Sequence, residues 1–159
     1  MICENVLGNI SEERFHGFHI DFVDIEWHEA FKKLHKKVTF GGVEIGIRLG
    51  NDILVRGLRQ GDVLWYGEDE VIAVNIPEAE MIVVDVQPDH PRMIPKVCYE
   101  IGNRHAALLY GDTPYQFITP YNEPVFDMLG KLHGVSVRKE KQKMDFDKRI
   151  SASVNAHTH

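Results

Sequence analysis

The sequence predicts an α+β fold, with a small all-β N-terminal domain, a ferredoxin-like βαββαβ domain and a flexible C-terminal tail. Residues 1–76 hold short apolar runs separated by turn residues, which is typical of small all-β domains. Residues 77–138 alternate strand-like with helix-like patterns, and residues 139–159 are polar and lack periodicity. A chain of 159 residues has room for two such small domains.

The N-terminal domain is expected to be a two-sheet sandwich. Residues 22–27 form the first clear strand, and apolar spacing from Trp27 to Leu34 predicts a short amphipathic helix with lysines on its polar side. Strict alternation over residues 43–49 predicts a half-buried strand. Residues 53–55 are expected to form another strand, and residues 63–74 a hairpin.

The second domain is expected to contain four strands and two helices. Residues 81–86 form a β-rich run, and an apolar stripe at helical spacing begins at Ile94 and predicts a helix that stops at Gly102. Two strands follow within residues 107–118. A second stripe over residues 125–132 predicts another helix, and the last strand begins at Val135. The resulting order is βαββαβ, the ferredoxin-like arrangement.

Composition excludes several classes of protein. The 18 basic and 24 acidic residues give a net charge of −6, which argues against general binding to nucleic acid or anionic membranes and favours cations or proteins as partners. Two cysteines provide neither a disulfide framework nor a CxxC zinc site. The N-terminus does not resemble a signal peptide, and no apolar run approaches a membrane span. We therefore expect a cytoplasmic protein.

The sequence contains no recognisable catalytic motif. Neither a phosphate-binding glycine loop nor a GxSxG or Cys/His signature is present, and Cys98 lies within the apolar stripe of a predicted helix. We therefore expect a protein that is not an enzyme.

The histidines are the remaining candidates for chemistry. His105 follows a predicted helix C-terminus, where the helix dipole alone would explain it. His157 and His159 form an H-x-H pair that suits borderline metal ions, although an end without function is an equally fair interpretation. His90 and His133 are interpreted as a turn residue and a helix-end residue, without a ligand. Together the histidines point weakly to reversible metal binding.

Residues 99–105 read Tyr-Glu-Ile-Gly-Asn-Arg-His, which resembles the signature of the UreE urease accessory proteins, a family of nickel metallochaperones. The Gly-Asp-Val-Leu segment at 61–64, the β-rich half followed by a ferredoxin-like half, and the C-terminal histidines resemble the same family in order and spacing. The resemblance therefore covers nearly the whole chain.

The resemblance implies a homodimer that binds one ion between its subunits through His105 of each. His157 or His159 would complete the site around Ni(II), and Zn(II) or Cu(II) could occupy it too. It further implies delivery to apo-urease through the complex containing the GTPase UreG, with partner binding by residues 1–76. Because the chain lacks a histidine-rich tract, about one tight ion per dimer is expected.

Two other functions compete with a metal carrier. One is a protein-binding module whose histidines are incidental. The other is a small metal-dependent hydrolase that uses His105 with Asp112 or Glu100, for which the sequence offers neither a third fixed ligand nor a base.

Overall fold

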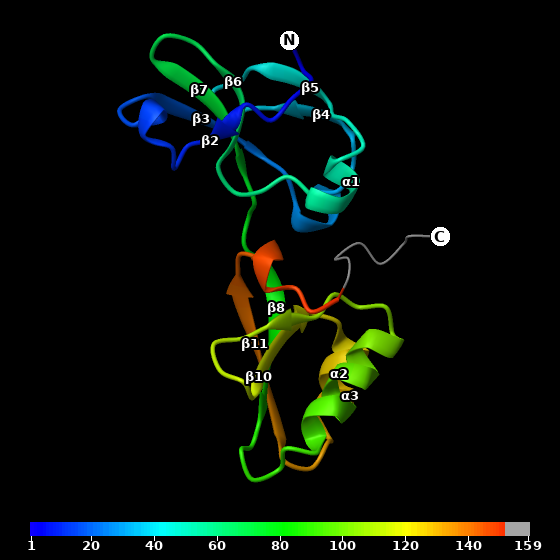
Figure 1. Ribbon diagram of the computed structural model, residues 1–159. Coiled ribbons are helices and arrows are strands. Elements are labelled where there is room, and N and C mark those ends of the chain that lie inside the picture. The colour runs from blue at the N-terminus through cyan, green and yellow to red at the C-terminus, as the bar shows by residue number, and fades with distance from the viewer. Residues whose placement is uncertain (152–159) are drawn as a thin grey trace. The chain divides into compact units, whose positions relative to one another are not determined.

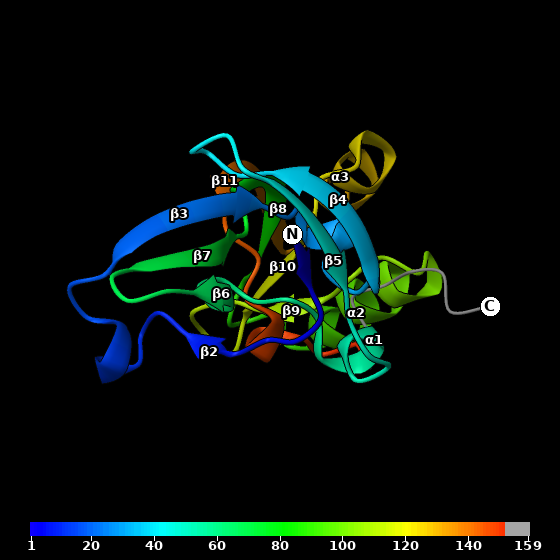
Figure 2. The same ribbon diagram turned by 90° about the horizontal axis from the view of Figure 1, so that it is seen from above.

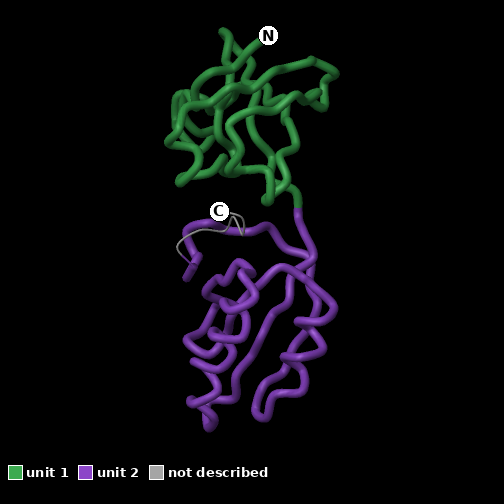
Figure 3. Tube along the Cα trace, turned by 90° about the vertical axis from the view of Figure 1, so that its right-hand side faces the viewer, with its two compact units in different colours: residues 1–77 green, residues 78–159 purple. Residues whose placement is uncertain are grey.

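The chain divides into two compact units, Met1–Pro77 and Glu78–His159 (Figure 3), and the computed structural model describes residues 1–151. Sheets dominate both units and the helices are few and short, so the predicted α+β class is confirmed. Among the helices of the described residues, none combines the length and apolar character that crossing a bilayer requires.

The first unit is built from two sheets (Figure 2). The strand neighbours within each sheet are antiparallel, except for the parallel pairs β1 with β5 and β3 with β7. The three-stranded sheet has the order β1 (Ile2–Cys3), β5 (Glu44–Arg48), β4 (Leu34–Val38), and the four-stranded sheet has the order β2 (Gly8–Asn9), β6 (Asp62–Tyr66), β7 (Glu70–Asn75), β3 (His19–Asp24).

Alternation in the sequence explains the core of this unit. Ile45 and Ile47 on β5 are buried while Glu44 and Arg48 are exposed, as the period-two pattern predicts. The predicted hairpin is also present, because β6 pairs with β7 in the antiparallel sense. Short helical turns connect the strands at Glu13–Phe15 and Trp27–Glu29.

The amphipathic helix expected from Trp27 to Leu34 is wrong. Only Trp27–Glu29 is helical, as one 3-10 turn, and the lysine-rich stretch after it forms β4. β4 pairs along its whole length with the buried strand β5. This pairing gives β4 backbone hydrogen-bond partners along one edge and overrides the helical spacing of the apolar residues.

The strand expected at residues 53–55 is also wrong, because Ile53–Arg56 is the short helix α1. A run of three apolar residues cannot distinguish a strand from a helix. The helix places the Arg56 guanidinium at 2.7 and 2.9 Å from the two carboxylate oxygens of Asp62. Asp62 is fully buried and also accepts a hydrogen bond from the backbone N–H of Arg59. A buried carboxylate thus has the partners that it needs.

The second unit has the predicted ferredoxin-like βαββαβ topology. Its antiparallel sheet has the order β11-β8-β10-β9, and α2 and α3 cover one face of it (Figure 1). In chain order the elements are β8 (Ala79–Val86), α2 (Met93–Asn103), β9 (Leu109–Tyr110), β10 (Gln116–Pro120), α3 (Glu123–Gly130) and β11 (Val135–Gln142).

The central strand β8 is apolar on both faces. Ile82 and Val84 belong to the cluster that includes Val97 and Ile101 of α2 and Leu129 of α3. Because side chains alternate along a strand, the residues between them face away from the helices. Met81 and Val83 are nevertheless buried. The second face of the sheet must therefore be covered as well.

The C-terminal segment covers that face. The prediction that a flexible tail begins at residue 139 is therefore wrong. β11 extends to Gln142, and a 3-10 turn follows at Phe146–Lys148. Met144 and Phe146 are buried. Basic residues dominate this stretch of the sequence, so Met144 and Phe146 do not stand out there as residues that anchor it to the core. His157 and His159 lie outside the described residues.

Replacing Phe146 by alanine should destabilise the second unit. The ring is only 4% exposed, and truncating a buried Phe costs about 3 kcal/mol. Hydrogen exchange of the most protected β8 amides measures the loss, because both tryptophans lie in the first unit and would not report it. The exposed Lys141→Ala variant is the control, with a change expected within about 0.5 kcal/mol. Equal protection in both variants would show that the segment does not contribute to the core.

Candidate metal centre

His105 lies immediately beyond the C-terminus of α2, in a Schellman motif. The N–H of His105 donates to the carbonyl of Gly102 at 3.0 Å, and the N–H of Ala106 donates to the carbonyl of Ile101 at 3.4 Å. These bonds satisfy carbonyls that the end of a helix leaves without partners. Ile101 is fully buried, so the motif is attached directly to the core.

The backbone of His105 is left-handed, with φ of 58°, and no other residue except glycine among positions 1–151 has positive φ. Glycine usually occupies this position of the motif, because a Cβ makes the left-handed conformation unfavourable. The sequence suggested Gly102 as the helix stop, which is wrong: the helix continues to Asn103. A histidine thus stands where backbone geometry favours glycine.

Contacts on the C-terminal side hold this conformation in place. The hydroxyl of Thr119 on β10, itself buried, donates to the carbonyl of Ala107 at 2.8 Å. The N–H of Ile150 donates to the carbonyl of Leu108 at 2.7 Å. The residues after His105 are therefore tied both to the sheet and to the C-terminal segment. A sparsely populated backbone conformation persists when its surroundings determine it in this way.

The side chain of His105 is exposed at the surface of the second unit. Arg104 is directed to Glu100, with 2.7 Å between its guanidinium nitrogen and the carboxylate. Tyr99, six positions before His105 and on α2, is 66% exposed. The last turns of α2 before His105 therefore expose an aromatic ring and carry an ion pair.

The C-terminal segment leads from the core to the neighbourhood of His105. The hydroxyl of Ser151, the last described residue, lies 3.2 Å from the backbone nitrogen of Leu108, which donates to it. Leu108 is only three positions beyond His105. The position of His157 and His159 relative to His105 is not described, and their role as ligands remains a prediction.

The two carboxylates that a hydrolase site at His105 was expected to use each have a basic partner. Glu100 is paired with Arg104, and the carboxylate of Asp112 lies 3.7 Å from the ammonium of Lys148. Within residues 1–151, no group of three or more His, Cys, Asp or Glu side chains is arranged to hold a metal ion. A metal site at His105 therefore needs further ligands from outside residues 1–151 of the same chain.

The cysteines are poor candidates for ligands. Cys98 packs partly buried against the α2 core, and Cys3 is buried in the first unit. Burial raises the pKa of both thiols. Because the thiolate is the form that binds metals, raised pKa values favour packing over coordination.

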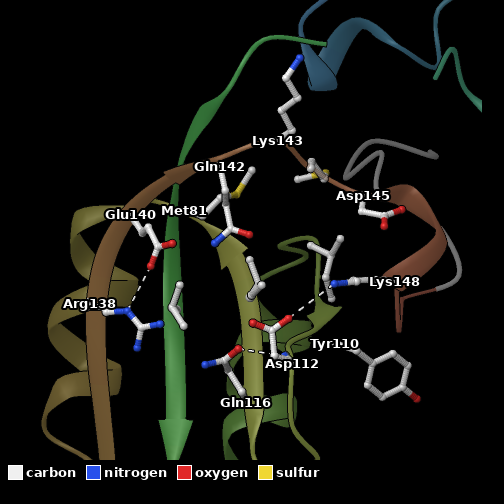
Figure 4. Close-up of a pocket in the computed structure, with 14 residues that line it drawn as sticks. Met81, Tyr110, Asp112, Gln116, Arg138, Glu140, Gln142, Lys143, Asp145 and Lys148 are labelled. Atoms are coloured by element: carbon white, nitrogen blue, oxygen red, sulfur yellow. Dashed lines mark hydrogen bonds and ion pairs between the residues drawn. The ribbon is translucent and has the colours of Figure 1, made fainter. Parts of the chain in front are cut away.

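A small cavity of about 130 Å³ lies beneath the C-terminal segment, on the face of the sheet opposite the helices (Figure 4). Charged side chains line it in opposed pairs, including Arg138 with Glu140 at 3.1 Å and Lys148 with Asp112. No histidine or cysteine is among its described lining residues. The described lining of the cavity therefore does not offer imidazole or thiolate ligands.

Sequence reasoning missed a pair of histidines in the second unit. His90 was interpreted as a turn residue and His133 as a helix-end residue, but their Nε2 atoms lie 3.0 Å apart. They are 43 positions apart in the chain, and no local pattern indicates the contact. The near-equivalence of the two helix-containing halves of the unit is the one signal that could have suggested it.

Replacing His105 by glycine should leave the second unit more stable than replacing it by alanine, by about 1 kcal/mol. Both variants lose the imidazole, but only glycine adopts the left-handed backbone without steric cost. The free energy of opening, from hydrogen exchange of the α2 amides, measures the difference. Equal stability of the two variants would mean that the left-handed backbone at this position carries no cost.

Two protein-family models match this chain, one over each unit. A family model described as the N-terminal domain of the UreE urease accessory protein matches residues 3–77, and one described as its C-terminal domain matches residues 81–159.

Individual relatives agree with the family models. The urease accessory protein UreE of Helicobacter pylori (strain P12) is 42% identical over 154 residues, which cover 97% of this chain and 88% of the relative. The protein of the same name from Helicobacter acinonychis is 41% identical with the same coverage. That of Acetivibrio thermocellus is 41% identical over 145 residues, covering 91% and 89%. The resemblance suggested by residues 99–105 is confirmed, and the chain belongs to the UreE family of urease accessory proteins.

Proposed function

We propose that this protein is a cytoplasmic nickel metallochaperone that delivers Ni(II) to apo-urease, with one ion held between the two subunits of a homodimer. Membership of a urease accessory family supports a role in urease maturation. The nickel cargo, the dimer and the ligands are what the resemblance to this family implies, and the chemistry of the second unit supports them.

The left-handed backbone of His105 is the observation that carries this proposal. A strained position that persists in a well-tied segment is a reason to look for a function in its side chain. An imidazole is a common ligand for nickel, copper and zinc. The exposed position of this one leaves it accessible to an ion and to a second chain.

A twofold axis between two chains would double the number of ligands at the site. One His105 offers a single nitrogen, and residues 1–151 provide no group of three metal-binding side chains around it. In a symmetric dimer the same residue occurs twice at an isologous interface, so two imidazoles can meet on the axis. The exposed ring of Tyr99, six positions before His105 on α2, supplies apolar surface for such an interface.

His157 and His159 are the proposed additional ligands. Six residue steps separate Ser151 from His157, a length of at most about 20 Å. Because Ser151 is hydrogen-bonded to Leu108, this length brings the tail histidines within reach of His105. With two His105 side chains already present, one or two further nitrogens approach the four to six ligands usual for Ni(II).

An open site of this kind suits a carrier. A closed set of four rigid protein ligands retains its ion, whereas two fixed imidazoles with one or two exchangeable further ligands allow transfer to another protein. Nitrogen ligands bind Cu(II) more tightly than Ni(II) and also accept Zn(II), so both ions should compete at the same site. Ion supply and the receiving partner, rather than affinity alone, would then select nickel.

Partners would meet the protein through the first unit. Leu34, Val38 and Phe40 leave large apolar side chains exposed there, beside the lysines of β4. Exposed apolar surface next to charge is typical of protein-binding sites. We assign to this unit the docking of the urease assembly complex that contains UreG.

Loss of His105 should abolish tight nickel binding. Equilibrium dialysis of the wild type is expected to give about one Ni(II) per dimer, and His105→Gly should lose this ion while remaining folded. The exposed His28→Ala variant, from the first unit, is the matched control and should bind as the wild type does. Equal uptake by the wild type and His105→Gly would favour a protein-binding module whose histidines are incidental.

Deleting residues 157–159 should weaken nickel binding without removing it. Two His105 imidazoles remain in the shortened dimer, so the expected loss in affinity is about tenfold or more, with unchanged thermal stability. A titration followed by nickel absorption spectra gives both the affinity and the change in coordination. Identical spectra and affinity would show that the tail does not contribute a ligand.

A further inference from the structure

The contact between His90 and His133 joins two connections at one end of the second unit. His90 lies between β8 and α2, and His133 lies between α3 and β11 (Figure 1). The backbone holds these connections together, because the N–H of Gln87 donates to the carbonyl of Gly134 at 2.8 Å. The two imidazoles are thus fixed by the fold rather than brought together by long flexible side chains.

The distance between the rings matches that of two ligands on one ion. Two nitrogens bound at about 2.1 Å and at a right angle lie about 3.0 Å apart, and the Nε2 atoms of His90 and His133 are 3.0 Å apart. The ring centroids are 4.7 Å apart and the planes are inclined by 73°. A collinear N–H···N contact would separate the centroids further, so the rings approach each other at an angle.

Asp89 orients the first of these rings. Its carboxylate lies 2.8 Å from Nδ1 of His90, and this hydrogen bond is the main reason that the pKa of Asp89 is below its usual value. A carboxylate on the far nitrogen of a ligating imidazole is a recurrent feature of metal sites. It holds the proton on Nδ1 and leaves the Nε2 lone pair available to an ion.

Gly134 makes room for the same ring. A Cβ at this position would lie 2.6 Å from Cγ of His90, and the backbone of Gly134 has positive φ of 74°. Only glycine satisfies both conditions. The imidazole of His90 is consequently packed against the backbone and is less free than an ordinary surface histidine.

We propose that His90 and His133 form a second binding site for a borderline divalent transition ion, Ni(II), Cu(II) or Zn(II), in each chain. The two Nε2 atoms are the protein ligands, and water completes the coordination. Because His133 is exposed and no third metal-binding side chain is grouped with the pair among residues 1–151, the site is open and exchanges its ion readily.

This site is separate from the one proposed at His105. Helix α2 has 11 residues and is therefore about 16 Å long, with His90 before its first turn and His105 after its last. One ion cannot contact both within a chain. The two sites also differ in construction, because the pair of His90 and His133 is complete in one chain and does not require a dimer.

The test uses the full-length chain carrying His105→Ala, so that the site at His105 is absent. Cu(II) is added in substoichiometric amounts while the imidazole ¹⁵N resonances of all remaining histidines are recorded. The signals of His90 and His133 should broaden together, at a lower copper concentration than those of His28. Broadening confined to other histidines, or uniform over all of them, would overturn the proposal without bearing on the role of His105.

Substitutions then measure the contribution of each group by calorimetric titration with Ni(II). In the same background, His90→Gln or His133→Gln should weaken binding at least tenfold, with His28→Gln as the matched control. Asp89→Asn should weaken binding by about tenfold while retaining it, as expected for a group that orients a ligand. Unchanged affinity in both His90→Gln and His133→Gln would contradict the proposal. Thermal unfolding of each variant excludes loss of the fold as the cause of weaker binding.

Discussion

The left-handed conformation of His105 depends on its attachment at both ends. On one side, the Schellman motif bonds it to the last turn of α2, whose Ile101 is fully buried. On the other side, the carbonyls of Ala107 and Leu108 accept hydrogen bonds from Thr119 of β10 and from the C-terminal segment. Removing either attachment would let the backbone relax. The position of this imidazole is therefore a property of the whole second unit.

The two faces of the ferredoxin-like sheet have different roles in the second unit. One face carries α2 and α3, and so holds His105 and the pair of His90 and His133 at opposite ends of one helix. The other face is covered by the segment with Met144 and Phe146. The described part of that segment ends at Ser151, whose hydroxyl accepts a hydrogen bond from the backbone N–H of Leu108, three positions beyond His105.

Much of the fold follows from local patterns, and the errors have specific physical causes. Alternation in β5 and helical stripes in α2 and α3 identified these elements, because each buries one face against a neighbouring layer. The lysine-rich strand β4 was taken for part of a helix because its pairing with β5 is a long-range effect. The cover formed by residues 143–150 was missed for a similar reason, since its need arises from the second apolar face of β8.

The candidate site was predictable only in part. The heptad at residues 99–105 identified the family and His105, but the left-handed backbone that distinguishes this histidine depends on hydrogen bonds that the sequence does not display. The contact of His90 with His133 joins residues 43 positions apart, and neither has a local signature. Residue types alone therefore indicate which side chains are available to a metal, and the fold decides which of them meet.

Anomalous diffraction at the nickel absorption edge, from crystals of the nickel-loaded protein, addresses the shared ion most directly. The proposed carrier requires one strong peak on a twofold axis, bonded to Nε2 or Nδ1 of His105 from each of two chains. Nickel bound to His105 of a single chain, or a dimer whose strongest peak lies away from both His105 side chains, would contradict it.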